Sequence, residues 1–197
     1  MSELTDTKLE VLNSHYDETV SNIRAALRQR DRLFVLLLVI VTVMLLQAIA
    51  PEEAGAALSE MVGARLGVDP IDVSVISSVL WFSALAAVVR YFQAVVYAER
   101  QYEYIHSLEE VLSSYFDDKA FTREGRAYLD GYPLFSKWTW VLYTIAFPGL
   151  LVAVLGGKLI AEMCGASFGL QIAFDSLAFV LITISTALYL TLVHFRR

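Results

Sequence analysis

Charged and strongly polar side chains beside long apolar runs are the residues of this chain whose chemistry is most informative. Lys158 and Asp175 border two such runs, and Ser77, Arg90 and Gln93 lie in or just after a third. A charge near a hydrocarbon environment is costly unless it is paired or reaches water. Ser77, Arg90, Gln93 and Asp175 are therefore our candidate pore or gate residues.

Each of these residues also has a purely structural interpretation. An ion pair between Lys158 and Asp175 would close a hairpin of two helices, and we favour it over a pore-lining Asp175. Arg90 could extend its side chain to lipid headgroups at a membrane boundary. Alternatively, copies of Arg90 in an oligomer could surround the inner mouth of a channel and favour anions.

A second group of candidates is basic. Lys119, Arg123, Arg126 and Lys137 alternate with aromatic residues in the longest connection between apolar runs. Arginine and aromatic rings bind anionic nucleotides by charge pairing and stacking, although acidic neighbours argue against a general nucleic-acid surface. Contact with lipid headgroups is the alternative. The candidate ligand- or partner-binding residues are Arg100, Lys119, Arg123 and Arg126.

The sequence carries no motif of a familiar enzyme or metal site. It has no phosphate-binding glycine loop, HExxH, CxxC or GxSxG pattern. Its three histidines (His15, His106 and His194) lie on separate segments, and Cys164 is its only cysteine. We expect no enzymatic activity, no cofactor, no metal and no intrachain disulfide.

The candidate residues lie on or between four uncharged apolar blocks, Leu33–Ile49, Val73–Val89, Trp138–Gly157 and Ser176–Val193. Each is close to the roughly 17–25 residues that cross a bilayer as a helix. The chain of 197 residues is 57% hydrophobic, so we predict an integral membrane protein with four spans. The expected segments are a cytoplasmic amphipathic helix (1–32), spans (33–49, 71–97, 138–160 and 170–195), outer loops (50–70 and 161–169), and a cytoplasmic stalk helix and loop (98–137).

Basic residues predict the orientation of these spans. Thirteen of the 15 Lys and Arg residues fall in 1–32, 90–137 and 196–197, and the other two are Arg65 and Lys158. By the positive-inside rule both termini and the central connection are cytoplasmic. The first apolar block begins too far along the chain for a signal peptide and is expected to remain as a span.

Helical periodicity continues outside the spans. Residues 5–32 carry one apolar stripe, and no Gly or Pro occurs from Ile71 to Lys119, which predicts one long helix. We expect the two to pair as a cytoplasmic helical bundle. Pro148-Gly149 predicts a kink in the third span. Small residues in the second and fourth spans allow close helix packing within a subunit, contacts between subunits, or contact with water.

The stretch YFQAVVYAERQYEYIHSLEE at 91–110, with the preceding membrane hairpin, resembles SLATT-type proteins, which are small bacterial membrane effectors of nucleotide-signal immunity. The resemblance implies a pore that stays silent until an infection signal releases it. SLATT proteins have one pair of spans, whereas this chain has a second pair at 138–195. A four-span chain of this size is also similar to the membrane subunit of the Kiwa antiphage system (KwaA), which works with a cytoplasmic partner.

One short pattern resembles an enzyme family. Arg100 and His106 are separated by five residues, similar to the R-x4–6-H pattern of HEPN ribonucleases, and the polar residue that usually follows the Arg is here Gln101. The resemblance implies RNA cleavage by two such helices in a dimer. A solvated Arg100 and a packed His106 are the alternative, which we favour.

These observations lead to one expectation and one alternative. We expect an all-α polytopic membrane protein that binds lipids and forms a homo-oligomer, with a tetramer favoured. In this interpretation it is an antiphage pore gated from its cytoplasmic bundle by a nucleotide or oligonucleotide signal or a defence protein. The alternative is a non-conducting scaffold that recruits a soluble effector.

Overall fold

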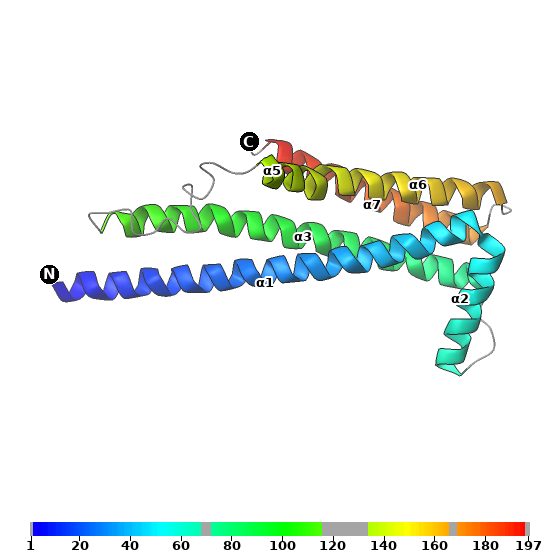
Figure 1. Cartoon of the computed structure of the whole chain (residues 1–197), viewed down its shortest axis with the longest axis horizontal. Helices are drawn as coiled ribbons and strands as arrows, with labels where there is room; N and C mark the ends of the chain where they lie inside the picture. Colours follow the sequence, from blue (N-terminus) through cyan, green and yellow to red (C-terminus); the bar gives the residue numbers. More distant parts are fainter. Residues whose placement is uncertain (1, 68–71, 116–133, 166–168, 196–197) are drawn as a thin grey trace. The chain divides into compact units, whose positions relative to one another are not determined.

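The computed structural model describes residues 2–67, 72–115, 134–165 and 169–195, and these residues are helical almost throughout. The elements in chain order are α1 (Ser2–Ile49), α2 (Pro51–Leu66), α3 (Val73–Ser113), α5 (Leu134–Val141), the π-helical turn η1 (Leu142–Ala146), α6 (Phe147–Gly165) and α7 (Leu170–Phe195) (Figure 1).

Within the described residues, four helical stretches are long and apolar enough to cross a membrane: Thr7–Ile49, Val73–Ser113, Trp138–Cys164 and Leu170–Leu192. The predicted class, an all-α protein with four candidate spans, is confirmed.

The chain divides into two compact units. One, which we call the stalk unit, comprises 1–32 and 93–139; the other, the membrane unit, comprises 33–92 and 140–197. Helices α1 and α3 each contribute to both units without interruption. The amphipathic N-terminal segment therefore continues directly into the first span, as predicted, and the second span belongs to a helix of 41 residues.

The stalk unit is built on a pair of helical segments, one from α1 and one from α3. The Tyr16 hydroxyl of α1 donates a hydrogen bond of 3.2 Å to Oε1 of Glu109 on α3. The other buried side chains of these two segments are small or aliphatic: Thr19, Ile23, Ala26, Ala94, Ala98, Ile105, Leu108 and Leu112. The expected pairing of the stalk with the N-terminal helix is confirmed.

Some tyrosines on the same part of α3 are exposed and do not belong to this buried group. Tyr97, Tyr104 and Val111 are spaced seven residues apart and stay exposed, with 43–45% of their surface accessible. A spacing of seven keeps them on one side of the helix. We name Tyr97, Tyr104 and Val111 the tyrosine stripe.

In the membrane unit, the small residues of α3 pack inside the chain. Ala84 and Ala87 are buried beside the large rings of Trp81 and Tyr91. On α7 the buried positions recur every three or four residues, at Ala178, Ile182, Thr186 and Tyr189. These buried small residues pack within one subunit, whereas others, such as Ser83 on α3 and Ala187 on α7, are exposed in the single chain. Apolar residues such as Val35, Leu36 and Val39 face outward, as expected for helices in lipid.

The segment 50–70, expected as a loop, is largely helical. Pro51 occupies the first turn of α2, where its missing N–H costs nothing. The helix ends at Gly67, whose left-handed φ of 67° suits glycine and lets its N–H bond the Gly63 carbonyl. The next helix is capped by Asp72, whose Oδ1 accepts a 2.8 Å hydrogen bond from the Ser74 N–H. That bond lowers the pKa of Asp72, because it stabilises the charged carboxylate.

The third span departs from regular α-helix one turn before Pro148-Gly149, where the sequence predicted a kink. In η1 the Phe147 N–H bonds the Leu142 carbonyl, five residues back. The matching partner for the Tyr143 carbonyl would be Pro148, which has no N–H. The Tyr91 hydroxyl on α3 donates to this carbonyl instead, at 3.4 Å. The π-helical turn and the proline thus expose a backbone acceptor, and α3 satisfies it.

We expect Tyr91→Phe to destabilise the detergent-solubilised protein by about 1 kcal/mol, because the partly buried Tyr143 carbonyl loses a donor. The cost should shrink in a Pro148→Ala background, where residue 148 supplies an N–H. Unfolding in mixed micelles measures both, and Tyr97→Phe, an exposed position, is the control. An equal cost of Tyr91→Phe in the two backgrounds would contradict this account of the π-helical turn.

Candidate functional site in the membrane unit

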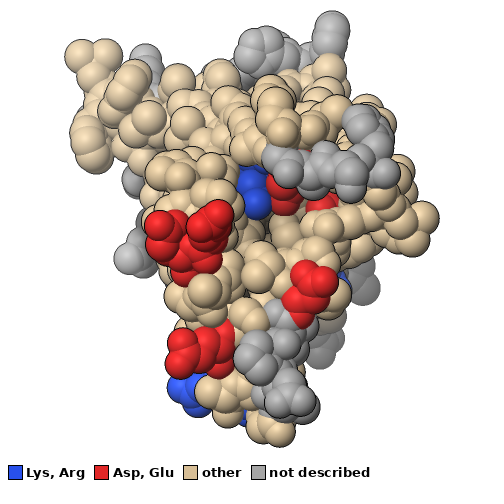
Figure 2. Space-filling model, turned by 90° about the vertical axis from the view of Figure 1, so that its right-hand side faces the viewer, with Lys and Arg blue, Asp and Glu red and all other residues tan. Residues whose placement is uncertain are grey.

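Three helices of the membrane unit bring polar side chains together, and we name this group the polar cluster. Its members are Ser77, Ser78 and Trp81 on α3, Lys158 and Glu162 on α6, and Asp175 on α7. All lie within two or three turns of a helix end, because α3 and α7 begin and α6 ends at that side of the unit. Figure 2 views this side and shows basic and acidic side chains recessed in a hollow between uncharged surfaces.

Glu162 is the best-satisfied charge of the polar cluster. Its Oε1 accepts a hydrogen bond of 2.7 Å from the Ser77 hydroxyl and lies 3.0 Å from Nζ of Lys158. Its Oε2 accepts a bond of 3.2 Å from the Trp81 indole N–H. Three donors from two helices therefore satisfy this carboxylate.

Asp175 is held much less completely. Its Oδ1 accepts a hydrogen bond of 3.0 Å from the Ser78 hydroxyl. Its Oδ2 is buried without a hydrogen-bond partner, and only 1% of the residue is exposed. A carboxylate in this position lacks the donors that usually offset the loss of water.

The polar cluster carries one ammonium group and two carboxyl groups, so one negative charge is in excess when both are ionised. The favoured ion pair between Lys158 and Asp175 is wrong: Nζ of Lys158 pairs with Glu162, one helical turn away on α6. A pair four residues apart on one helix forms locally, because both side chains leave the same face.

Glu162 is the functional residue that the sequence analysis missed. The predicted third span ends at residue 160, so the prediction places Glu162 in an outer loop. In the structure α6 continues to Gly165. The signal was present in the sequence, since Lys158 and Glu162 have the spacing of a helical ion pair. Recognising it required extending the helix beyond the uncharged block.

The structure brings together only two of the four predicted pore or gate residues, Ser77 and Asp175. Arg90 follows Ser77 by 13 residues on α3, which is about 20 Å along the helix axis. Arg90 and Gln93 are both exposed in the single chain. They therefore do not belong to the polar cluster.

Of the predicted ligand- or partner-binding residues, Arg100 lies exposed on α3 in the stalk unit. Lys119, Arg123 and Arg126 lie outside the described residues. Arg100 and the half-buried His106 leave one regular helix about 120° apart. A site using both side chains would therefore need a second chain.

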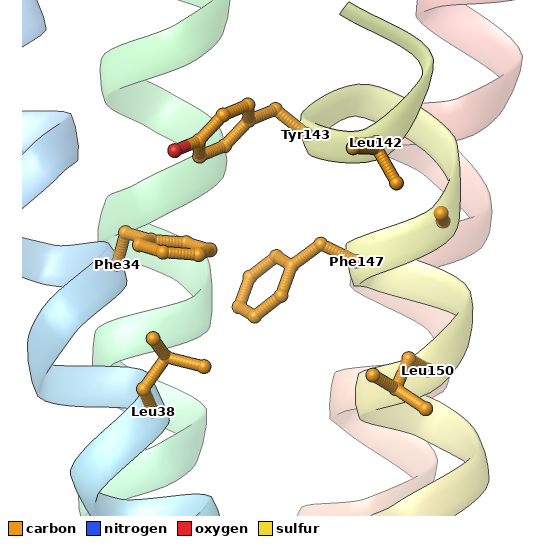
Figure 3. Close-up of a pocket in the computed structure, with 7 residues that line it drawn as sticks. Phe34, Leu38, Leu142, Tyr143, Phe147 and Leu150 are labelled. Carbon is orange, nitrogen blue, oxygen red and sulfur yellow. The ribbon is translucent and has the colours of Figure 1, made fainter. Parts of the chain in front are cut away.

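A separate apolar groove of about 570 Å³ opens at the other end of the membrane unit. Phe34 and Leu38 of α1 line it together with Leu142, Tyr143, Ala146, Phe147 and Leu150 of η1 and α6 (Figure 3). The Phe34 ring contacts the rings of Tyr143 and Phe147, with centroids 5.1 and 4.6 Å apart. This lining offers packing for hydrocarbon and almost no polar group for recognition. It carries no candidate chemistry.

Among the residues that the structure describes, no three His, Cys, Asp or Glu side chains are placed to hold a metal ion. The fold and the polar cluster together define a polytopic α-helical membrane protein with charged residues inside its helical bundle. Comparisons with protein-family models, curated proteins and solved structures gave no match to this chain.

We expect Lys158→Met and Glu162→Gln each to destabilise the solubilised protein by about 3 kcal/mol, because each leaves a buried charge without its partner. The double variant should cost clearly less than the two single variants together. Unfolding in mixed micelles measures this cycle. Arg30→Met is the control, because it removes an exposed ion pair with Asp31 that contributes at most about 1 kcal/mol. Additive costs would show that Lys158 and Glu162 do not act as a pair.

Proposed function

We propose that this protein is the subunit of an oligomeric ion-conducting pore in a bacterial inner membrane, with its pathway passing the polar cluster. The carrying observation is Asp175, a buried and incompletely satisfied carboxyl group in a candidate span. Ionisable residues inside membrane helices are costly, and they commonly mark ion pathways or proton relays. A bundle built only for packing has no need of Asp175, since leucine would avoid this cost.

Conduction on this proposal requires several copies or a movement of helices. Large side chains fill the interior of the membrane unit, among them Leu37, Met44, Trp81 and Leu155, which are inaccessible to solvent. A single chain therefore has no open passage along its axis. A tetramer is our proposed assembly, with the tyrosine stripe forming contacts between copies. Its seven-residue spacing suits helix–helix packing.

Gating is proposed to begin in the stalk unit. Helices α1 and α3 carry residues of the stalk unit and of the membrane unit in one uninterrupted helix each. A signal that rearranges the stalk unit would act on the same two helices that supply the first two spans. The resemblance to SLATT-type and Kiwa membrane proteins suggests antiphage defence as the setting. The signal would be a nucleotide, an oligonucleotide or a partner protein.

The tyrosine stripe also favours a second candidate function, a membrane scaffold that recruits a soluble effector. Exposed tyrosines are common anchors of protein interfaces. A scaffold would bind its partner through the stripe without moving ions. A stoichiometric cytoplasmic protein that co-purifies with wild type and is lost with Tyr104→Ala would favour this candidate.

We expect the protein in liposomes to dissipate an imposed potassium diffusion potential faster than protein-free liposomes do. Ser77→Ala should slow this dissipation several-fold, because it removes a donor that positions Glu162. Ser83→Ala is the matched control, since Ser83 is exposed on the same helix. A voltage-sensitive dye reports the potential, and the mass of the solubilised protein tests for four 22.0 kDa chains. A potential that persists with wild-type protein, before and after addition of nucleotides and oligonucleotides, would exclude a pore that is open at rest or opened by either of these signals.

The orientation is tested through Cys164, which is exposed near the end of α6. We expect a membrane-impermeant maleimide to label Cys164 in intact spheroplasts, because the positive-inside rule places this end outside. A Cys164→Ser, Glu18→Cys variant, with its thiol in the stalk unit, should be labelled only after lysis. The reverse pattern would invert the proposed topology.

A further inference from the structure

The two carboxyl groups of the polar cluster have opposite surroundings although they lie at the same end of the membrane unit. Glu162 receives three donors, one of them the Lys158 ammonium group. Asp175 receives one hydroxyl donor on Oδ1, and its Oδ2 is enclosed without a partner. Two carboxyl groups held so differently suit two different protonation states. Both oxygens of Glu162 accept from donors, whereas only one oxygen of Asp175 does.

Charge balance leads to the same assignment. With Lys158 and Glu162 both charged, their pair is neutral, and an ionised Asp175 adds one uncompensated negative charge to a low-dielectric interior. One bound proton removes that charge. We infer that Asp175 is a proton-binding site within the membrane, and that its protonation and release are a step in ion movement through this protein. The second part of this inference rests on the proposed pore, whereas the first does not.

The groups around Asp175 come from each helix that contacts it. Helix α3 supplies the Ser78 hydroxyl, and α6 supplies the charges of Lys158 and Glu162. Gln171, one turn earlier on α7, also interacts with the Asp175 side chain. The span at 33–49 contains no ionisable residue. Lys158 favours release of the proton and Glu162 favours its retention, so Asp175 is balanced between two neighbours of opposite charge.

A proton fits this site better than a metal cation does. Metal cations with oxygen ligands take about six or more of them in proteins. The described surroundings of Asp175 hold no group of three carboxylate, thiol or imidazole side chains, and the neighbouring ammonium group of Lys158 would repel a metal ion. A proton needs only the free oxygen of Asp175.

Protons would reach the site from the side on which α2 lies. Asp175 is five residues from the start of α7, so it lies about 8 Å along the axis from that end. Exposed acidic residues on this side, Glu52, Glu53, Glu60 and Asp72, outnumber the basic Arg65 (Figure 2). Deeper in α7, the hydroxyls of Thr183, Ser185 and Thr186 bond their own helix backbone. These three hydroxyls are therefore already engaged within α7 and are not free to donate to Asp175.

Infrared difference spectroscopy of the full-length protein in liposomes tests the binding site directly. On titration from acid to alkaline pH, wild type should lose the carbonyl band of a buried protonated carboxyl group, and Asp175→Asn should lack this band. Asp72→Asn is the matched control, because Asp72 is an exposed aspartate whose hydrogen bond to Ser74 keeps it charged. Ser78→Ala should keep the band but move its midpoint to higher pH, because the charged form loses its donor. Thermal unfolding of each variant shows that it is folded.

The same liposomes, loaded with a pH-sensitive dye, separate the two parts of the inference. Proton uptake driven by an imposed potential should fall at least tenfold in Asp175→Asn and remain in Asp175→Glu and Asp72→Asn. A titrating band without any wild-type flux would support the site and exclude the pore. Wild-type spectra identical to those of folded Asp175→Asn across the titration would overturn the site. Undiminished proton uptake in Asp175→Asn would overturn its part in ion movement.

Discussion

The arrangement of the membrane unit depends on the two hydrogen bonds and the ion pair of the Glu162 carboxylate. Three donors reach it, and two of them, from Ser77 and Trp81, cross from α3 to α6. Only 14% of the Glu162 side chain is exposed, so water replaces these donors poorly, and the two helices must keep their register for the charge to be tolerated. Apolar packing alone would allow neighbouring registers, because aliphatic side chains in lipid impose little direction.

The same requirement explains the irregular part of the third span. Pro148 has no N–H to donate, and η1 shifts the hydrogen-bond pattern by one residue, so that Phe147 bonds the Leu142 carbonyl. The Tyr91 hydroxyl on α3 donates to the Tyr143 carbonyl instead. Helix α3 is therefore attached to the third span twice, by the polar cluster near one end and by Tyr91 near the other. Between these attachments, apolar side chains fill the bundle.

Asp175 is a buried charge whose hydrogen bonding is incomplete, and the proposed function rests on it. Every other buried charge in the described membrane unit has an ionic or multiple hydrogen-bond partner. Asp175 keeps one oxygen unsatisfied while lying next to a neutralised ion pair. A site of this kind changes charge at a small structural cost, because one proton decides whether the polar cluster is neutral. A pore and a non-conducting scaffold make opposite predictions about whether that change moves ions.

Much of this fold could be predicted from the amino-acid sequence. Four uncharged blocks of bilayer length required four apolar helices, and the lack of Gly and Pro from Ile71 to Lys119 required a long α3, because both properties are local. Ser77 and Asp175 were identified as candidates, since polar groups in apolar segments are conspicuous. Their meeting in one cluster was not foreseeable, because it depends on how α3 and α7 are rotated about their axes.

The tertiary structure decided which donors of α3 reach Glu162 and which reach Asp175. Lys158 could reach Asp175 in the next span or Glu162 one turn later, and only the extension of α6 to Gly165 settled the choice in favour of Glu162. The pairing on α6 leaves Asp175 without an ammonium partner and its Oδ2 without a hydrogen bond. The sequence by itself thus determined which helices cross the membrane and which residues are ionisable there. The packing of those helices determined which charge is satisfied and which is left for a proton, because donors and acceptors pair by distance in space.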